Sequence, residues 1–311
     1  MPILSICIPA YNRPIWLKRA ILSVIEQRFS EEIELIISDD STDTKNSQIA
    51  EKILSNWTGK WQYLHNIPSL GMSQNWNRSI ELASGSYILL LHDDDFLYPN
   101  SLQEIISTIK SQTKLVFLFG AAVVDENEQI LKYQRVSGYL CPKKALIEVL
   151  SNSSFVRFPA IVIAKEAFEY VGFFKANLAE PADLEMWVRL FRTYGVFCTN
   201  TITCAYTVHS QALTMGIFTE RTIVTILSIF EQALPVLSEE ELAQCQNNFF
   251  YQFILAGAFR MLRRGYWKKF RQTMKLFELP QLQHIKSPSW FWSMLRCTFS
   301  MLSQQLTKIA N

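Results

Sequence analysis

The sequence predicts an α/β protein with a mostly parallel sheet, helices on both faces of that sheet, and a helical extension at its C-terminal end. Short apolar segments alternate with amphipathic segments of helical period through residues 4–124. The apolar segments are continuous runs, which is typical of strands buried on both faces in a parallel sheet. Beyond residue 217 the pattern is helical almost throughout.

Strands and helices are expected in strict alternation in the first half of the chain. Pro14 stands at the start of the first helix and Gly85 follows the third, as their backbone preferences favour. Strands are expected at residues 4–9, 33–38, 61–65, 87–91 and 115–124, and helices at residues 14–27, 47–56, 72–83 and 100–110.

The second half of the chain is less regular. From about residue 129 to 207 we expect short strands at 160–164 and 202–208 and a helix at 183–194. Long helices are expected at 224–237 and 239–264, with breaks at Gly265 and Pro280. The chain therefore divides into an α/β domain, residues 1–216, and a helical, basic extension, residues 217–311.

Composition indicates a globular intracellular protein. Hydrophobic residues make up 49% of the 311 positions and aromatic residues 13%, which suffices for a sizeable core. The six cysteines form no CxxC pair, a pattern that favours reduced thiols and a cytoplasmic location. An apolar strand begins by residue 3, so no signal peptide is expected, and no apolar run reaches the roughly 18 residues of a membrane span.

The net charge of +2 hides an asymmetry between the ends of the chain. Residues 260–311 carry ten Lys/Arg and one acid, Glu278, which leaves −7 for the rest. Aromatic residues are interleaved with these charges, as in segments that lie on anionic membranes. Packing of the aromatics on the core explains the pattern equally well. Peripheral membrane contact through 260–311 stays open, and nucleic-acid binding is not expected.

The most informative segment is Tyr87-Ile-Leu-Leu-Leu-His-Asp-Asp-Asp95, in which an apolar strand runs into three carboxylates. Ligands of open α/β sheets bind outside the carboxyl ends of the strands. Adjacent carboxylates repel one another unless a cation lies among them, and oxygen ligands suit Mn²⁺ or Mg²⁺. A solvated turn that caps the next helix is the alternative.

Polar residues follow three other predicted elements. They are Pro9-Ala-Tyr-Asn-Arg13 after the first strand, Asp39 and Asp40 after the second, and Asn77 in the third helix. Asp183 begins a later amphipathic helix, where it is either an N-cap or a general base.

In this order and spacing, over about residues 3–210, the segments closely resemble family 2 glycosyltransferases of the GT-A fold. The resemblance implies an inverting enzyme that uses a nucleotide-sugar donor, a UDP- or dTDP-sugar, with Mn²⁺ or Mg²⁺ on the diphosphate. It implies that Pro9, Tyr11 and Arg13 line the nucleoside pocket. Asp39 would meet the uracil edge, Asp40 would support that loop, and Asn77 would approach the donor.

The resemblance also assigns the chemistry. Asp94 matches the final Asp of the family's Asp-x-Asp element and would bind the metal, with Asp93 and Asp95 near the donor. His92 replaces the usual first Asp. His209 matches a late histidine that in some relatives completes the metal or diphosphate site. Asp183 matches the catalytic base, although Ala182 replaces the usual preceding Glu.

The expected function is transfer of a sugar to a saccharide or lipid-linked acceptor in polysaccharide or cell-envelope synthesis. The protein would work in the cytoplasm or at the inner face of the plasma membrane. Two alternatives stay open: a catalytically decayed nucleotide-sugar-binding protein and a nucleotidyltransferase. The missing GxxxxGK[ST] motif excludes a P-loop phosphotransferase.

Overall fold

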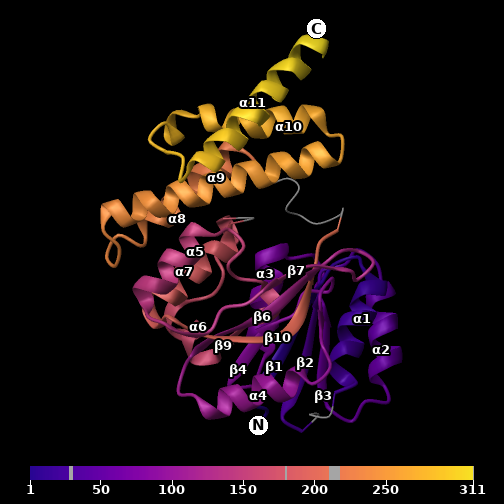
Figure 1. Cartoon of the computed structure of the whole chain (residues 1–311). Coiled ribbons are helices and arrows are strands. Elements are labelled where there is room, and N and C mark those ends of the chain that lie inside the picture. Colours follow the sequence, from indigo (N-terminus) through magenta and orange to yellow (C-terminus); the bar gives the residue numbers. More distant parts are fainter. Residues whose placement is uncertain (28–30, 179–180, 210–217, 311) are drawn as a thin grey trace.

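The computed structural model describes residues 1–27, 31–178, 181–209 and 218–310, and its α/β body carries helices stacked above one end (Figure 1). Within these residues the strands form one ten-stranded sheet. The strands are β1 (Leu4–Ala10), β2 (Ile33–Asp39), β3 (Lys60–His65), β4 (Tyr87–Leu90), β5 (Phe96–Leu97), β6 (Val116–Val124), β7 (Ile130–Gln134), β8 (Gly138–Leu140), β9 (Ile161–Ala164) and β10 (Val196–Thr207).

The sheet confirms the predicted fold class. The main path runs β3-β2-β1-β4-β9-β6-β10-β5, and β7 and β8 pair with β6 and β10. Strands β3, β2, β1 and β4 are parallel, as are β6 and β10, whereas β9 lies antiparallel between β4 and β6. The short strands β5, β7 and β8 are antiparallel additions that the sequence pattern did not predict.

The helices cover both faces of the sheet, as the alternation predicts. Helices α1 and α2 pack side by side (Figure 1). A right-handed connection from the edge strand β3 back to β4 places α3 on the opposite face, where the Cys7 thiol of β1 donates to the carbonyl of Ser79. The helices of the body are α1 (Pro14–Ile25), α2 (Lys45–Leu54), α3 (Met72–Leu82), α4 (Ser101–Ser111), α5 (Pro142–Ser151), α6 (Lys165–Val171) and α7 (Ala182–Tyr194), with 3-10 turns η1 (Phe158–Ala160) and η2 (Ala176–Leu178).

The order of the strands creates a crevice at their carboxyl ends. Strand β1 pairs with β2 on one side and with β4 on the other, so the chain reverses its direction across the sheet at β1. Ligands of open α/β sheets bind at such a point. The loops that leave β1, β2 and β4 carry the polar motifs, and these loops meet at this end of the sheet.

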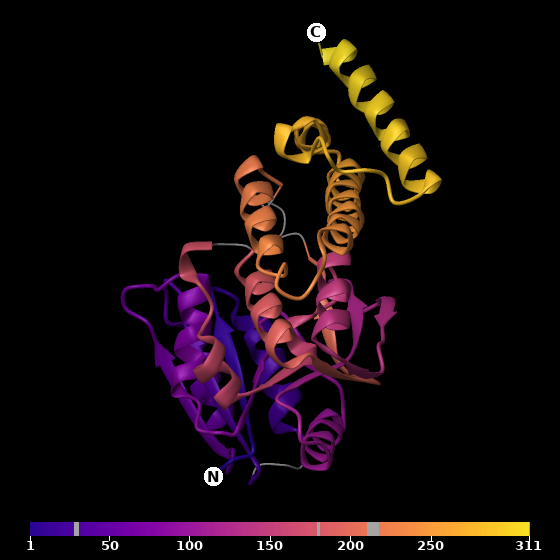
Figure 2. The same cartoon turned by 90° about the vertical axis from the view of Figure 1, so that its left-hand side faces the viewer.

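Four helices follow the body and stack on its upper end (Figures 1 and 2). They are α8 (Glu220–Glu231), α9 (Glu239–Arg263), α10 (Trp267–Lys275) and α11 (Trp290–Ala310), with turns η4 (Leu276–Glu278) and η5 (Pro280–Leu282) between the last two. Helix α9 packs along α5, so the extension contacts the body. The expected boundary at residues 216 and 217 lies outside the described residues.

Helix α11 has two apolar stripes, one packed on the core and one exposed. One stripe, with Trp292, Leu295 and Phe299, packs on the hydrophobic core. The other, at helical spacing, is exposed and contains Trp290, which is 76% exposed, and Met294, which is 51% exposed. Among the described residues, none of the helices combines the length and the apolar character that a bilayer span requires.

Candidate active site

The three acids after β4 lie at the reversal point of the sheet. The backbone N–H of Tyr11, just after β1, donates to Asp93 Oδ2 at 2.9 Å. Asp95 Oδ1 accepts from the backbone N–H of Thr207 at 2.8 Å, which ties the acidic loop to the end of β10. The sequence could not predict this second link, because the strand that contains Thr207 lies more than 100 residues further along the chain.

Asp94 lies between two basic side chains in this structure. Its Oδ2 is 2.7 Å from Arg13 Nη1 and 2.9 Å from His209 Nε2. Arg13 also reaches Asp93 Oδ1 at 3.2 Å. The structure therefore brings Asp94 and His209 together, as a shared cation site requires. It places Arg13 on the acids, a different partner from the nucleoside that the resemblance implies.

The donor set in this crevice fits a divalent cation. His92, Asp94 and Asp95 each offer a ligand atom, and these three atoms lie within 4.8 Å of one another. His92 Nε2 and Asp95 Oδ2 are buried and have no hydrogen-bond partner among the described residues. Carboxylate oxygens and neutral imidazole are ligands that Mn²⁺ accepts. His92, which replaces the family's first Asp, therefore retains a metal-ligand chemistry.

Burial and mutual repulsion set the electrostatics of the acidic cluster. Burial, and next the negative charge of Asp94, raise the pKa of Asp93 and of Asp95. Burial would also raise the pKa of Asp94, but the hydrogen bond with His209 and the nearby basic groups lower it overall. Burial lowers the pKa of His92 to about 4, so its imidazole is neutral and can offer a lone pair.

The imidazole of His92 is held by aromatic rings. It stacks on Trp76 with centroids 5.5 Å apart and lies 4.3 Å from the ring centroid of Phe158. These rings fix the plane of the imidazole relative to the acidic loop, as packing around a ligand histidine should.

Asp39 and Asp40 are buried, and their carboxylates are occupied by the protein itself. Asp39 Oδ1 accepts from Asn46 and twice from Ser41, and the hydroxyl of Tyr63 donates to its Oδ2. A contact with a nucleobase edge would compete with these bonds. Asp40 was expected to support the loop that holds Asp39, but its carboxylate instead accepts from four groups of the loop between β3 and α3: the side chains of Asn66 and Ser69 and the backbone N–H groups of Leu70 and Gly71.

Tyr11 and Pro9 differ in what they can contact. The ring of Tyr11 is 52% exposed at the exit of β1 and can stack on a base. Pro9 is buried inside β1 and pairs with Ser38, so it offers no surface to a nucleoside.

A cavity of about 260 Å³ opens beside the exit of β1 and is lined by Asn12, Arg13, Pro14, Ile15, Trp16, Glu126 and His209. Trp16, whose ring meets that of His209 edge-on at 4.2 Å, was not predicted as a site residue.

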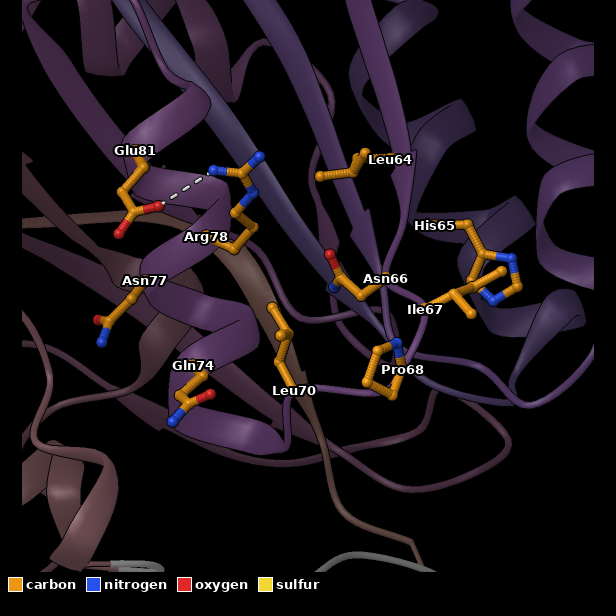
Figure 3. A pocket seen from close by; sticks show the side chains of 10 residues that line it. All are labelled: Leu64, His65, Asn66, Ile67, Pro68, Leu70, Gln74, Asn77, Arg78 and Glu81. Carbon is orange, nitrogen blue, oxygen red and sulfur yellow. Dashed lines mark hydrogen bonds and ion pairs between the residues drawn. The ribbon is translucent and has the colours of Figure 1, made fainter.

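Asn77 lies apart from the acids. Its amide bonds the backbone of Phe174 in both directions, donating to the carbonyl at 2.8 Å and accepting from the N–H at 2.9 Å. These two hydrogen bonds join α3 to the segment before α7. Asn77 also lines a separate cavity of about 510 Å³ between α3 and the end of β3 (Figure 3). The structure thus gives no support to a donor contact at Asn77.

Asp183 is the second residue of α7, because the helix begins at Ala182 with Pro181 as N-cap. It therefore lies in the first turn of the helix and not at the N-cap position. Its Oδ1 accepts from the backbone N–H of Leu184 at 2.6 Å. Burial raises the pKa of Asp183 to about 6, and the charge of Arg157 partly opposes that rise. A carboxylate with this pKa can accept a proton near neutral pH.

Tyr206 and Arg157 connect Asp183 with the acidic cluster, and sequence reasoning did not single them out. The guanidinium of Arg157 lies 4.5 Å from the ring centroid of Tyr206. The pKa of the Tyr206 phenol is raised, chiefly by burial. Arg157 opposes this rise, and the charges of Asp95, Asp94 and Asp183 add to it. Asp183 and the acids after β4 therefore face the same region around Tyr206.

Arg19 is a further residue that the sequence did not mark. It donates to the carbonyl of Asp94 and, at 3.0 Å, to the hydroxyl of Thr207. Its guanidinium also lies 4.5 Å from the ring centroid of Phe96. Arg19 thereby holds the acidic loop against the end of β10.

Comparison with known proteins identifies this arrangement. The family model described as glycosyl transferase family 2 matches residues 5–172, more than half of the chain. The match includes the acids after β4 and ends before Asp183 and His209. An uncharacterized glycosyltransferase of Rickettsia bellii is 26% identical over 250 residues, 79% of this chain and 35% of that protein. The chain spans 35–62% of the length of the first curated relatives that it matches.

Other relatives match over their full length or in three dimensions. The GalNAc(5)-diNAcBac-PP-undecaprenol beta-1,3-glucosyltransferase of Campylobacter jejuni is 20% identical, with 99% of this chain and 98% of that protein aligned. S. aureus TarS 1-349 in complex with UDP-GlcNAc matches with a TM-score of 0.64 at 17% identity, over 88% of this chain and 81% of that one. The mannosyltransferase PcManGT from Pyrobaculum calidifontis, in complex with GDP-Man and Mn²⁺, matches at 0.59 and 13%, over 97% and 81%. These likenesses show the GT-A fold.

Proposed function

The chain belongs to glycosyl transferase family 2, and we propose that it transfers a sugar from a UDP- or dTDP-sugar to a hydroxyl of a saccharide or lipid-linked acceptor with inversion at C1. The observation that carries this proposal is the arrangement around Tyr206. Acids suited to a cation and a carboxylate with a raised pKa, Asp183, both act electrostatically on the phenol of Tyr206. A donor and an acceptor hydroxyl need these two environments next to each other.

In this proposal, Asp94 and His209 hold a divalent cation, and His92 and Asp95 are further candidate ligands. The cation would act as a Lewis acid that neutralises the charge developing on the departing diphosphate. Mn²⁺ in the complex of the Pyrobaculum mannosyltransferase supports this assignment. Arg13 would release Asp94 and remain beside the phosphates, and the exposed ring of Tyr11 would stack on the base.

Asp183 acts as the general base. It takes the proton of the acceptor hydroxyl while that oxygen forms a bond to C1 of the donor sugar. The bond from C1 to the phosphate oxygen breaks on the opposite face, and its electron pair leaves with the nucleoside diphosphate. The transition state resembles an oxocarbenium ion, as in glycoside hydrolysis. General-base help of this kind contributes about 10²–10⁴-fold to the rate.

A donor screen tests the function. The full chain is incubated with UDP-, dTDP- and GDP-sugars with and without Mn²⁺, and release of nucleoside diphosphate and thermal shift are recorded. A metal-dependent shift with slow hydrolysis of one uridine or thymidine donor supports the proposal. A shift without turnover, even with saccharide and polyprenyl-diphosphate acceptors added, points to the decayed binding protein. Release of inorganic diphosphate from a nucleoside triphosphate and a sugar phosphate would identify a nucleotidyltransferase.

The acceptor in this proposal is lipid-linked, and the protein works at the inner face of the plasma membrane in envelope polysaccharide synthesis. The name of the Campylobacter relative, which acts on an undecaprenol-linked saccharide, supports this choice. The exposed stripe of α11 supports it as well, since Trp290 and Met294 lie beside a basic α10 with Lys268 and Lys269 exposed. Exposed aromatics next to lysines suit an anionic bilayer surface.

Vesicle flotation of the full chain tests the membrane contact. The double variant Trp290→Ser/Met294→Ser should lose most binding to anionic vesicles, because it removes two exposed apolar side chains of the stripe. Tyr170→Ser, at a 77% exposed aromatic on α6, is the matched control and should bind as the unaltered chain does. Equal flotation of all three proteins would discard the contact, and a loss of self-association in the double variant would assign the stripe to a second copy of the chain.

A further inference from the structure

Three basic side chains from distant parts of the chain bear on Tyr206. Arg157 lies over its ring, Lys132 is linked to it through Val123, which pairs with both residues, and Arg260 interacts electrostatically with Tyr206 and Arg157. Arg157 precedes η1, Lys132 lies in β7, and Arg260 lies in α9 of the C-terminal extension. None of the three makes an ion pair with a carboxylate in the part of the chain that the structure describes. We call Lys132, Arg157 and Arg260 the cationic cluster.

The guanidinium of Arg157 is held through Nε and one face, which leaves its two terminal nitrogens available. Its Nε donates to Gln134 Oε1 at 3.2 Å, and its guanidinium lies over the ring of Tyr206. Among the described residues its two terminal nitrogens have no hydrogen-bond partner. A guanidinium fixed through Nε and one face can present both terminal nitrogens to an anion in bidentate fashion, the geometry in which arginine binds phosphate.

Arg260 is the least satisfied member of the cluster. Its guanidinium lies 5.3 Å from the ring centroid of Phe218, and its Nε is buried without a hydrogen-bond partner in the described residues. Burial of a polar atom without a hydrogen-bond partner is unfavourable, so such atoms are usually paired or serve a ligand.

The charges of the cluster act on one another. The pKa of Arg260 is lowered, chiefly by burial. The charge of Tyr206 raises this pKa, and the positive charge of Arg157 lowers it further. Partial desolvation of its amino group, and next the charge of Arg157, lower the pKa of Lys132, although the residue is largely exposed; Arg157 also acts on Asp183. Arg157 therefore repels both other members of the cluster, and its charge reaches the proposed base.

We propose that Lys132, Arg157 and Arg260 form a binding site for a phosphoryl group, separate from the acids after β4, and that this group belongs to the acceptor. The proposal rests on the proposed function and names its acceptor class: a saccharide joined to a lipid through a phosphate or diphosphate. The acids with Arg13 and His209 already face the donor diphosphate, whereas Arg260 comes from the helices that stack above the crevice (Figure 2).

Calorimetry with inorganic diphosphate in EDTA tests the site without turnover or metal. The unaltered chain should bind diphosphate, and Arg157→Gln and Arg260→Gln should each weaken that binding about tenfold, the usual effect of losing a charge-assisted hydrogen bond. Arg263→Gln is the matched control, because it removes the same charge from an exposed position of the same helix, and its affinity should stay within about twofold. Arg157→Lys, which keeps the charge and loses the fork, should fall between.

Titration with UDP and Mn²⁺ distinguishes the two sources of phosphate. If the site serves the acceptor, the affinity of Arg260→Gln for UDP should stay within about twofold of the unaltered chain. A tenfold loss of UDP affinity would assign the cluster to the donor and overturn the acceptor assignment. Failure of the unaltered chain to bind diphosphate, or equal weakening by Arg263→Gln, would overturn the site itself. Diphosphate binding in a chain that fails the donor screen would leave the site standing and reject the enzyme function alone.

Discussion

Two acidic runs stand at the carboxyl ends of β2 and β4, the strands on either side of β1, and they differ in how their carboxylates are used. Asp39 and Asp40, after β2, accept hydrogen bonds from the protein at both of their oxygens. Asp95, after β4, keeps one buried oxygen without a partner in the described residues, and its pKa is raised by burial and by Asp94. The same sequence pattern thus gives a structural pair in one place and a candidate ligand site in the other. What separates them is the number of donors that folding brings to each.

The largest loss of activity is expected from a substitution at Asp183, a residue that belongs to neither acidic run. Asp183→Asn should lower kcat about 10²–10⁴-fold, because the amide cannot take the acceptor proton. Steady-state kinetics with the donor found in the screen measure this loss. Affinity for UDP and Mn²⁺, measured by calorimetry, should stay unchanged, and a parallel loss of UDP binding would argue that Asp183 contacts the donor instead.

The run after β4 should respond to substitution through metal and donor. Asp94→Asn should weaken Mn²⁺-dependent UDP binding about tenfold or more, because it removes a charged ligand from the cluster. Calorimetry with and without Mn²⁺ measures the effect. Asp43→Asn, at an exposed acid of the loop after β2, is the control and should bind as the unaltered chain does. Unchanged Mn²⁺ dependence in the Asp94 variant would make this acid structural like Asp40.

The run after β2 should respond through stability. Asp40→Asn should lower the free energy of unfolding by about 2–3 kcal/mol, because four donors of the loop after β3 lose a charged acceptor. Urea denaturation measures the change. The folded fraction should retain Mn²⁺ dependence, and a variant of unaltered stability with lost Mn²⁺ binding would mean that the two runs have been assigned the wrong way round.

The smallest effect expected is a pH-dependent stability difference at Asp183. Its pKa is raised from 3.8 to about 6 in the fold, so the carboxyl is compatible with folding below pH 4 and destabilises the chain as the pH rises through 6. Asp183→Asn lacks this penalty, and its Tm relative to the unaltered chain should be higher at pH 8 than at pH 5. The penalty is at most roughly 3 kcal/mol. A gap that does not change between the two pH values would contradict the buried, titrating carboxyl.

Most of the parallel half of the sheet was predictable, because its strands are continuous apolar runs that no other element explains. The antiparallel strands were not. All but the last residue of β7 are exposed, so this strand lacks the apolar run that marks a buried strand. Strand β5 has two residues and forms by pairing with β10, a partner more than 100 positions away. Pairing over such a distance leaves no local signal in the sequence.

The candidate site was predictable to a similar degree. Asp94 and His209 were expected in one cation site, and they lie together. Three features were not expected: Arg13 pairs with the acids, Asn77 bonds the backbone of Phe174, and Pro9 is buried. Each depends on which backbone or side chain lies opposite in space.

The sequence by itself determined that carboxylates stand at the carboxyl ends of buried parallel strands, because apolar runs and the turns that follow them are local properties. The tertiary structure alone decided which of those carboxylates were neutralised internally. It also decided that an arginine before η1 would lie over the ring of a tyrosine of β10. The physical reason is that burial and hydrogen-bond partners come from packing between segments far apart in the chain, and no short pattern of residues encodes that packing.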